Sequence, residues 1–206
     1  TITSATTTWH DDCFYQSWGT GGWNYYNGSH QVYLGSNSAS FNTDKVKVIY
    51  SGEDLDWSSS CRKILKQIPN KYILLLLEDL FVTTKIDPTE ITKHLKFIKK
   101  YKAKHIHLGP TPKPDKFINR EMGIYEKGAP YRVNVAGYWN NEYLLSLLID
   151  GESPWDFEIK GSYRTVNEDG FYCLEKPLFS IVHVLEKGSW LPEAVRYCKK
   201  HEVSLE

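Results

Sequence analysis

The stretch Tyr72-Ile-Leu-Leu-Leu-Leu-Glu78-Asp79-Leu80 decides the fold that we predict for this chain. Residues 72–77 form an unbroken apolar run between polar neighbours. Such a run is typical of a central strand that is buried on both faces. It is far too short to cross a bilayer, so we expect no membrane span. The sequence therefore predicts a layered fold whose central strand ends at two carboxylates.

Strand-like and helix-like segments alternate on either side of this run. Asp56 is placed to cap one helix, and residues 87–90 form a capping box with Pro88 at the first position of another. The alternation predicts an α/β fold with a mixed, mostly parallel sheet flanked by helices, in one domain over residues 1–206. We expect strands at 2–8, 31–34, 45–50, 72–77, 105–108, 131–135 and 179–185, helices at 57–68, from 88, at 141–149 and from 192, and an irregular loop at 109–130.

Composition narrows the classes of partner. The chain has 25 Lys and Arg against 25 Asp and Glu, so it lacks the basic surplus of a nucleic-acid-binding protein. Its 7 Trp and 14 Tyr favour a carbohydrate ligand, because aromatic faces stack on sugar rings, although an aromatic-rich core explains them equally well.

Cysteine usage and the first residue bear on location. The 4 cysteines form no CxxC pair and no zinc-binding spacing, which favours reduced, buried thiols in a cytoplasmic protein. No signal peptide precedes the first predicted strand. Because the first residue is Thr1 rather than Met, we expect either a trimmed chain or one domain of a longer protein.

Glu78 and Asp79 are the strongest candidates for chemistry. In an open α/β sheet, ligands bind at the carboxyl ends of the strands, where these two residues are expected. Burial of carboxylates is unfavourable unless they are compensated, and a divalent cation is a frequent partner. The alternative is that both acids cap the following loop or pair with Lys or Arg. We favour the metal site.

His183 interrupts the apolar strand predicted at 179–185. A lone histidine there is more often a hydrogen-bonded core residue than a ligand. The following Lys187-Gly188 strengthens the functional interpretation, because glycine lets the backbone approach a phosphate and lysine supplies a positive charge.

Residues 155–158, Trp-Asp-Phe-Glu, alternate aromatic and acidic side chains. In an extended segment, Asp156 and Glu158 share one face, and Trp155 and Phe157 share the other. The acidic face then lines a sugar pocket, or the segment is a surface strand whose aromatics belong to the core. Alternation alone favours neither.

Together these features resemble glycosyltransferases of the GT-A fold, which is Rossmann-like. The matching parts are residues 2–8, the strand that ends in Glu78-Asp79, and the later His183 with residues 187–190. More narrowly, the chain resembles the N-terminal glycosyltransferase domain of a chlorovirus enzyme that glycosylates capsid protein, which implies the host-cell cytoplasm as its location. One difference is clear: the family motif is Asp-x-Asp, whereas the two acids are adjacent here.

The resemblance implies a metal-dependent transfer from a nucleoside-diphosphate sugar. It implies Mn²⁺ or Mg²⁺ held by Asp79 and His183, with Glu78 as a further candidate ligand. UDP is the expected carrier, and a glycan or glycoprotein the expected acceptor. The donor-binding set is Thr6, Ser51, Arg62, Lys187 and Gly188.

The acceptor side of the expected site comes from residues 155–158 and a nearby Trp. Glu158 or Asp156 is the candidate catalytic base, and Trp155 or Trp139 is expected to stack on the sugar. The alternatives from other classes are a non-catalytic carbohydrate-binding module and a metal-dependent phosphohydrolase or nucleotidyltransferase.

Overall fold

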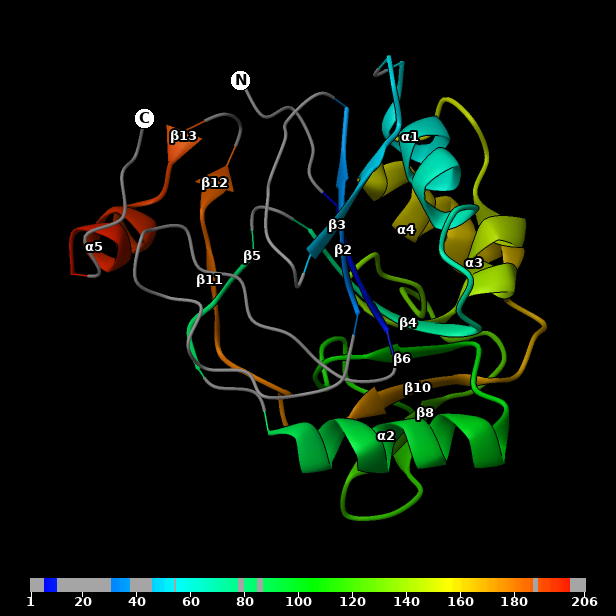
Figure 1. The fold of residues 1–206 in the computed structure, drawn as a ribbon. Coiled ribbons are helices and arrows are strands. Elements are labelled where there is room, and N and C mark those ends of the chain that lie inside the picture. Colours follow the sequence, from blue (N-terminus) through cyan, green and yellow to red (C-terminus); the bar gives the residue numbers. More distant parts are fainter. Residues whose placement is uncertain are drawn as a thin grey trace.

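The computed structural model describes residues 6–10, 31–37, 46–53, 55–77, 80–84, 87–186 and 189–200 (Figure 1). The helices in this part of the chain are α1 (Trp57–Leu65), α2 (Pro88–Tyr101), α3 (Asn141–Leu147), α4 (Pro154–Arg164) and α5 (Pro192–Lys200). The first seven strands are β1 (Thr6–His10), β2 (Val32–Ser36), β3 (Val46–Tyr50), β4 (Tyr72–Leu77), β5 (Leu80–Val82), β6 (His105–His107) and β7 (Lys116–Phe117). The remaining strands are β8 (Met122–Tyr125), β9 (Gly137–Asn140), β10 (Phe171–Leu174), β11 (Ile181–His183), β12 (Leu185–Glu186) and β13 (Ser189–Trp190).

Nine strands form one sheet in the order β3-β2-β1-β4-β9-β6-β10-β8-β7. The α/β class is confirmed, but the expectation of a mostly parallel sheet is wrong. Only β2–β3 and β6–β10 pair in parallel among the described strands of this sheet, and the other pairs are antiparallel. An apolar run reports burial on both faces but not the direction of the neighbouring strands, and β1 and β9 both run against β4.

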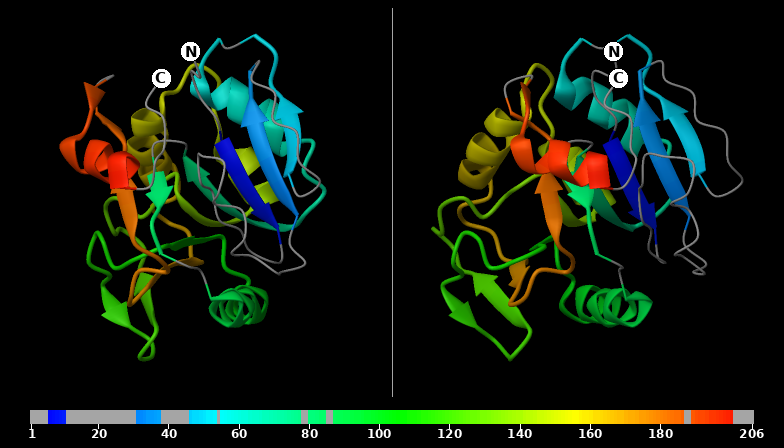
Figure 2. Two further views of the ribbon diagram at one scale, coloured as in Figure 1. Left: turned by 60° about the vertical axis from the view of Figure 1, so that its left-hand side comes forward. Right: turned by 90° about the vertical axis from the view of Figure 1, so that its left-hand side faces the viewer.

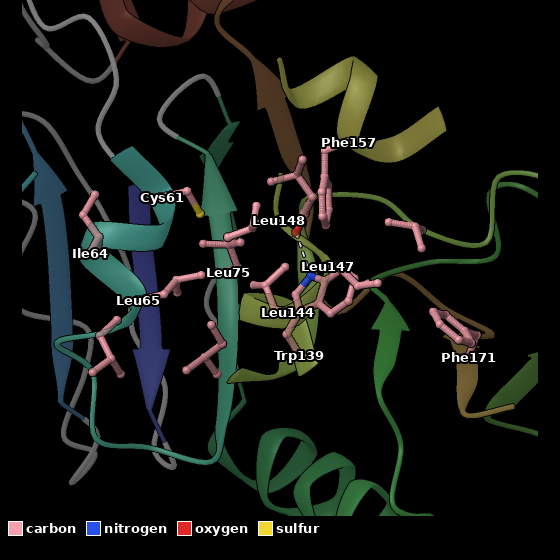
Figure 3. Close-up of a cluster of buried hydrophobic side chains, with 14 of the residues drawn as sticks. Cys61, Ile64, Leu65, Leu75, Trp139, Leu144, Leu147, Leu148, Phe157 and Phe171 are labelled. Atoms are coloured by element: carbon pink, nitrogen blue, oxygen red, sulfur yellow. Dashed lines mark hydrogen bonds between the residues drawn. The ribbon is translucent and has the colours of Figure 1, made fainter. Parts of the chain in front are cut away.

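The strand β4 supplies side chains to two hydrophobic clusters, one on each face of the sheet. Leu74 and Leu76 pack with α2 on one face. Ile73 and Leu75 pack with α1, α3 and α4 on the other face, in the cluster drawn in Figure 3. Figures 1 and 2 show α2 on the side of the sheet away from these three helices. Alternating side chains of one apolar strand therefore fill both cores.

The predicted helix starts are confirmed. The carboxylate of Asp56 accepts a hydrogen bond from the Ser59 N–H at 2.8 Å and caps α1. The carboxylate of Asp87 accepts one from the Thr89 N–H at 2.8 Å and caps α2, with Pro88 in the first turn. Each cap satisfies an N–H group that the helix leaves unpaired at its start.

The strand expected at residues 131–135 is absent, and the segment lies in an irregular stretch before β9. Its N–H groups bond to side chains instead of to a neighbouring strand. Val133 N–H donates to the Ser162 hydroxyl at 3.1 Å, and Val135 N–H donates to Glu158 Oε1 at 2.9 Å. Both acceptors come from α4, which the local sequence pattern of 131–135 does not reveal.

The segment 109–130 is more ordered than expected. It contains β7 and β8, and β8 joins the main sheet by pairing with β10. The strand β10 was not anticipated, because its residues Phe171–Leu174 are all buried and too few to show a periodic pattern.

Among the described residues, the cysteines are buried thiols, as expected, and the helices are too short or too polar to span a membrane. Cys61, Cys173 and Cys198 are free and buried, while Cys13 lies outside the described residues. Across the described ranges, no helix combines the length and the apolar character that a bilayer crossing requires.

Candidate active site

Six strands of the large sheet run in the same direction, and β7 is one of them because it is antiparallel to β8, which is antiparallel to β10. The strand β1 runs antiparallel to both β2 and β4, so β2 and β4 point the same way. The strand β9 is likewise antiparallel to both β4 and β6, while β3 and β10 run parallel to β2 and β6. We call the edge where β2, β3, β4, β6, β7 and β10 end the carboxyl edge. Ligands of open α/β sheets bind at such an edge, where the chain order of the strands reverses, as it does around β1.

Two residues of the predicted donor-binding set lie at the carboxyl edge. Thr6 pairs with Gly35 of β2 on one side and with Leu77, the last residue of β4, on the other. Ser51 directly follows β3 and is buried, and its N–H donates to the Ser36 carbonyl at 2.9 Å. The row Ile49–Gly35–Thr6–Leu77 crosses four neighbouring strands, about 14 Å at ordinary strand spacing, and Ser51 lies two residues beyond Ile49 toward the carboxyl edge.

Four predicted site residues lie outside the described residues. They are Glu78, Asp79, Lys187 and Gly188. The structure does describe the residues that flank the acidic pair. Leu77 ends β4 at the carboxyl edge, and Leu80 begins β5.

The short strand β5 brings His183 alongside the chain that follows Asp79. His183 pairs with Leu80 in the antiparallel β5–β11 ladder, and the Thr83 N–H extends this ladder by donating to the Ser180 carbonyl at 2.9 Å. Paired antiparallel residues have Cα atoms about 4.5–5.5 Å apart, so His183 lies beside the first described residue after the acidic pair.

His183 differs from the buried histidines of this chain. His94, His105 and His107 lie inside the protein, with ring nitrogens hydrogen-bonded to Tyr138 or to residues of the 131–138 segment. The side chain of His183 is instead exposed on β11. The interpretation of His183 as a core residue is therefore excluded, and its ring is accessible to a ligand.

The candidate metal ligands are two carboxylates and one imidazole. They suit a divalent cation, although the two carboxylates lie outside the described residues. Imidazole nitrogen together with carboxylate oxygen is a ligand combination compatible with Mn²⁺. Within the described ranges, no group of three or more His, Cys, Asp or Glu residues is arranged to hold a metal. His183 is the one predicted metal ligand in those ranges.

Arg62 lies in α1 and ties this helix to α3 and to the chain that follows it. Its Nε donates to Asp150 Oδ1 at 2.9 Å, and its Nη1 donates to the Leu145 carbonyl at 3.2 Å. Its Nη2 donates to the Leu148 carbonyl. Because its N–H groups are directed to these partners, Arg62 has a structural role and does not belong to the donor-binding set.

The extended arrangement considered for residues 155–158 is not the one observed, because these residues form the first turns of α4. Ser153 caps the helix in a capping box with Asp156, and Pro154 occupies the first turn. Asp156 also pairs with Lys160 at 2.9 Å. The hydrogen bond from Lys160, helped by those from Ser153, lowers the pKa of Asp156 to about 2. So weak a base does not suit general-base catalysis near neutral pH, and Asp156 is assigned to helix capping.

Glu158 is the acid of this segment that faces the sheet. It is half-buried, and its Oε1 accepts the Val135 N–H at 2.9 Å. Val135 stands just before β9, whose first residue Gly137 pairs with Leu75, two residues before the end of β4. Glu158 therefore lies near the carboxyl edge. Burial raises its pKa above the ordinary value of 4.5, and the weaker effect of the Val135 hydrogen bond opposes this.

The two tryptophans proposed to stack on sugar have opposite environments. Trp139 is 1% exposed and packs in the core, where its ring stacks on His105 with centroids 3.8 Å apart. Its Nε1 donates to the Val135 carbonyl, the dashed bond in Figure 3. With its ring inside the core, Trp139 is not available to a sugar, which corrects that assignment. Trp155 is 73% exposed and remains available.

A buried polar network beneath the carboxyl edge was not anticipated. His105 Nε2 is 2.7 Å from Asn134 Oδ1, and His107 Nε2 is 3.0 Å from the Arg132 carbonyl. Burial lowers the pKa of His107 to about 4 and that of His105 well below its ordinary value, so both rings are neutral near pH 7. The His-Ile-His pattern was its only sequence signal, since its partners are distant in the chain. We assign this network to positioning the 131–136 segment.

Comparison with known proteins identifies no relative from which a function can be transferred. No family model, curated protein or solved structure matches the chain. The functional assignment therefore depends on the residues and their placement.

Proposed function

We propose that this chain is a metal-dependent glycosyltransferase of the GT-A type, which transfers a sugar from a UDP-sugar to a glycan or glycoprotein acceptor. The pairing of His183 with Leu80 is the observation that carries the proposal. It brings an exposed imidazole next to the chain that follows Glu78-Asp79, as a shared cation site requires. The gathering of Thr6, Ser51 and the end of β4 at one edge gives further support.

The residues divide into three groups around the donor. Asp79 and His183 hold the cation, with Glu78 beside them. Thr6 and Ser51 line the nucleotide end, and Lys187 and Gly188 contact the diphosphate. These residues would hold Mn²⁺ or Mg²⁺, which would supply Lewis-acid neutralisation of the negative charge on the diphosphate.

Glu158 is the proposed catalytic base. An acceptor hydroxyl oxygen attacks the anomeric carbon, and the bond from that carbon to the phosphate oxygen breaks. UDP departs with the electron pair of the broken bond, and the hydroxyl proton passes to Glu158. A half-buried carboxylate with a raised pKa suits this role.

Calorimetric titration with UDP, in Mn²⁺ and in EDTA, tests the function. We expect binding that requires the metal. Binding of free oligosaccharides without UDP binding would instead identify a carbohydrate-binding module. UDP binding followed by hydrolysis of the diphosphate, with no release of sugar from a UDP-sugar, would identify a phosphohydrolase.

His183→Ala is expected to weaken Mn²⁺ affinity more than tenfold, since even the loss of a residue that only supports a metal ligand costs about that much. Because His183 is exposed, the fold should be unaffected. Ile181→Ala is the matched control, an exposed residue on the same strand two positions away. Isothermal titration with Mn²⁺ and thermal unfolding measure the two effects. Unchanged Mn²⁺ affinity in folded His183→Ala would remove His183 from the site.

A further inference from the structure

The helix α4 carries an exposed apolar stripe. Trp155, Ile159 and Tyr163 are 73%, 47% and 75% exposed. Their spacing of four residues places them on one face of the helix. The opposite face is occupied, because Phe157 points from α4 into the core in Figure 3 and Gly161 packs against Val133. The stripe is therefore not the core-facing side of α4.

The stripe lacks net charge. Asp156 and Lys160 flank it on the same exposed side of α4 and pair with each other at 2.9 Å. Their charges cancel, so this face offers no electrostatic attraction to an anionic or cationic partner. A partner that matches this surface is uncharged. It has flat apolar faces that can contact the Trp155 and Tyr163 rings, and hydroxyl groups that can bond to the Asp156–Lys160 pair.

The size of the stripe argues against a second copy of the chain as the occupant. A fully buried aromatic side chain removes about 150–250 Å² from water, so the three partly exposed side chains offer roughly 400 Å² together. A stable protein interface buries about 800 Å² on each partner. Trp155 and Tyr163 are separated by eight residues, or about 12 Å along the helix. That length exceeds one sugar ring and fits a short oligosaccharide.

We propose that Trp155, Ile159 and Tyr163 bind a neutral oligosaccharide portion of the acceptor. The Trp155 and Tyr163 rings stack on the apolar C–H faces of the sugars, and the Asp156–Lys160 pair exchanges hydrogen bonds with their hydroxyls. Trp155 and Glu158 are three residues apart, which makes them neighbours on the helix surface. The stripe thus begins beside the proposed base. The inference rests on the proposed function for naming this oligosaccharide as an acceptor.

The test compares the double variant Trp155→Ala/Tyr163→Ala with the unaltered chain. Both positions are exposed and helical, and alanine has the highest helix propensity, so the fold should be retained. The probes are neutral hexasaccharides of glucose, N-acetylglucosamine, mannose and galactose, titrated without metal or nucleotide. We expect the unaltered chain to bind at least one probe, and the double variant to bind it at least tenfold more weakly. Phe117→Ala is the control, because Phe117 is 48% exposed on the far edge strand β7.

The outcomes separate this inference from the proposed function. Loss of oligosaccharide binding with unchanged Mn²⁺-dependent UDP binding supports both. If the chain binds oligosaccharide through the stripe but does not bind UDP, the proposed role of the stripe is supported and the proposed transferase function is overturned. If the unaltered chain binds no probe, or if the double variant binds equally well, the proposal that the stripe binds oligosaccharide is overturned. Self-association in sedimentation that the double variant abolishes would assign the stripe to a second copy and also overturn it.

Discussion

In Asp79→Ala, we expect Mn²⁺-dependent UDP binding to fall below detection, a loss of at least about 100-fold, while the chain remains folded. The physical reason is the position of Asp79 in the sequence. It follows Leu77, which ends β4 at the carboxyl edge, and precedes Leu80, which pairs with His183. In the proposed site, a carboxylate there would supply charge to a cation that imidazole alone holds weakly, and the diphosphate would bind through that cation.

Calorimetry with UDP in Mn²⁺ measures this loss, and thermal unfolding reports on the fold. Asp169→Ala is the matched control, because Asp169 is an exposed acid that pairs with Lys127 and precedes β10 at the opposite edge of the sheet. The control should bind UDP normally. Metal-dependent UDP binding that persists in folded Asp79→Ala would show that the cation site lies elsewhere.

The elements that the sequence predicts best carry their signals within a few residues. The strand at residues 72–77 has the bounds expected for it, because an apolar run between polar residues specifies a strand buried on both faces. The helix starts at Asp56 and Asp87 were predictable because the capping carboxylate and the N–H that donates to it are only two or three residues apart.

The features that sequence reasoning missed depend on contacts between distant segments. The alternation at 131–135 is that of a strand, but its N–H groups bond to Ser162 and Glu158 of α4. The direction of each strand likewise depends on its neighbours, which an apolar run does not identify. No local pattern could have supplied either kind of information.

The segment at 155–158 shows how two local signals can conflict. Four alternating residues suggest a strand, but they are too few to decide between periods of two and 3.6. The preceding Ser153-Pro154 and the acid at Asp156 form a helix N-terminus with a capping box, and the capping box prevails. The correction matters for function, because it separates Asp156 from Glu158 and brings Trp155 into line with Tyr163.

Glu158→Gln is expected to lower sugar transfer by about 100-fold or more, the ordinary scale for loss of a general base, and to leave UDP affinity unchanged. The amide oxygen of glutamine can still accept the Val135 N–H, so the local structure should persist. The probes are UDP-glucose, UDP-galactose and UDP-N-acetylglucosamine, with UDP release measured in the presence of water or an oligosaccharide acceptor. Glu142→Gln is the control, and it should transfer at a nearly normal rate. Glu142 is an exposed acid of α3.

The pH dependence distinguishes a catalytic Glu158 from a structural one. Burial raises the pKa of Glu158 above 4.5, so the folded chain holds this proton more tightly than the unfolded chain does. The stability contributed by this group is therefore full below pH 4.5 and is lost as the pH rises through the folded pKa. Glu158→Gln removes this loss, and urea unfolding at pH 7 should show a variant at least as stable as the unaltered chain. Because the base must be deprotonated, the rate of the unaltered chain should rise with pH through the same window, and that rise should disappear in the variant. Normal transfer with an unchanged pH profile in Glu158→Gln would mean that Glu158 only anchors the 131–136 segment to α4.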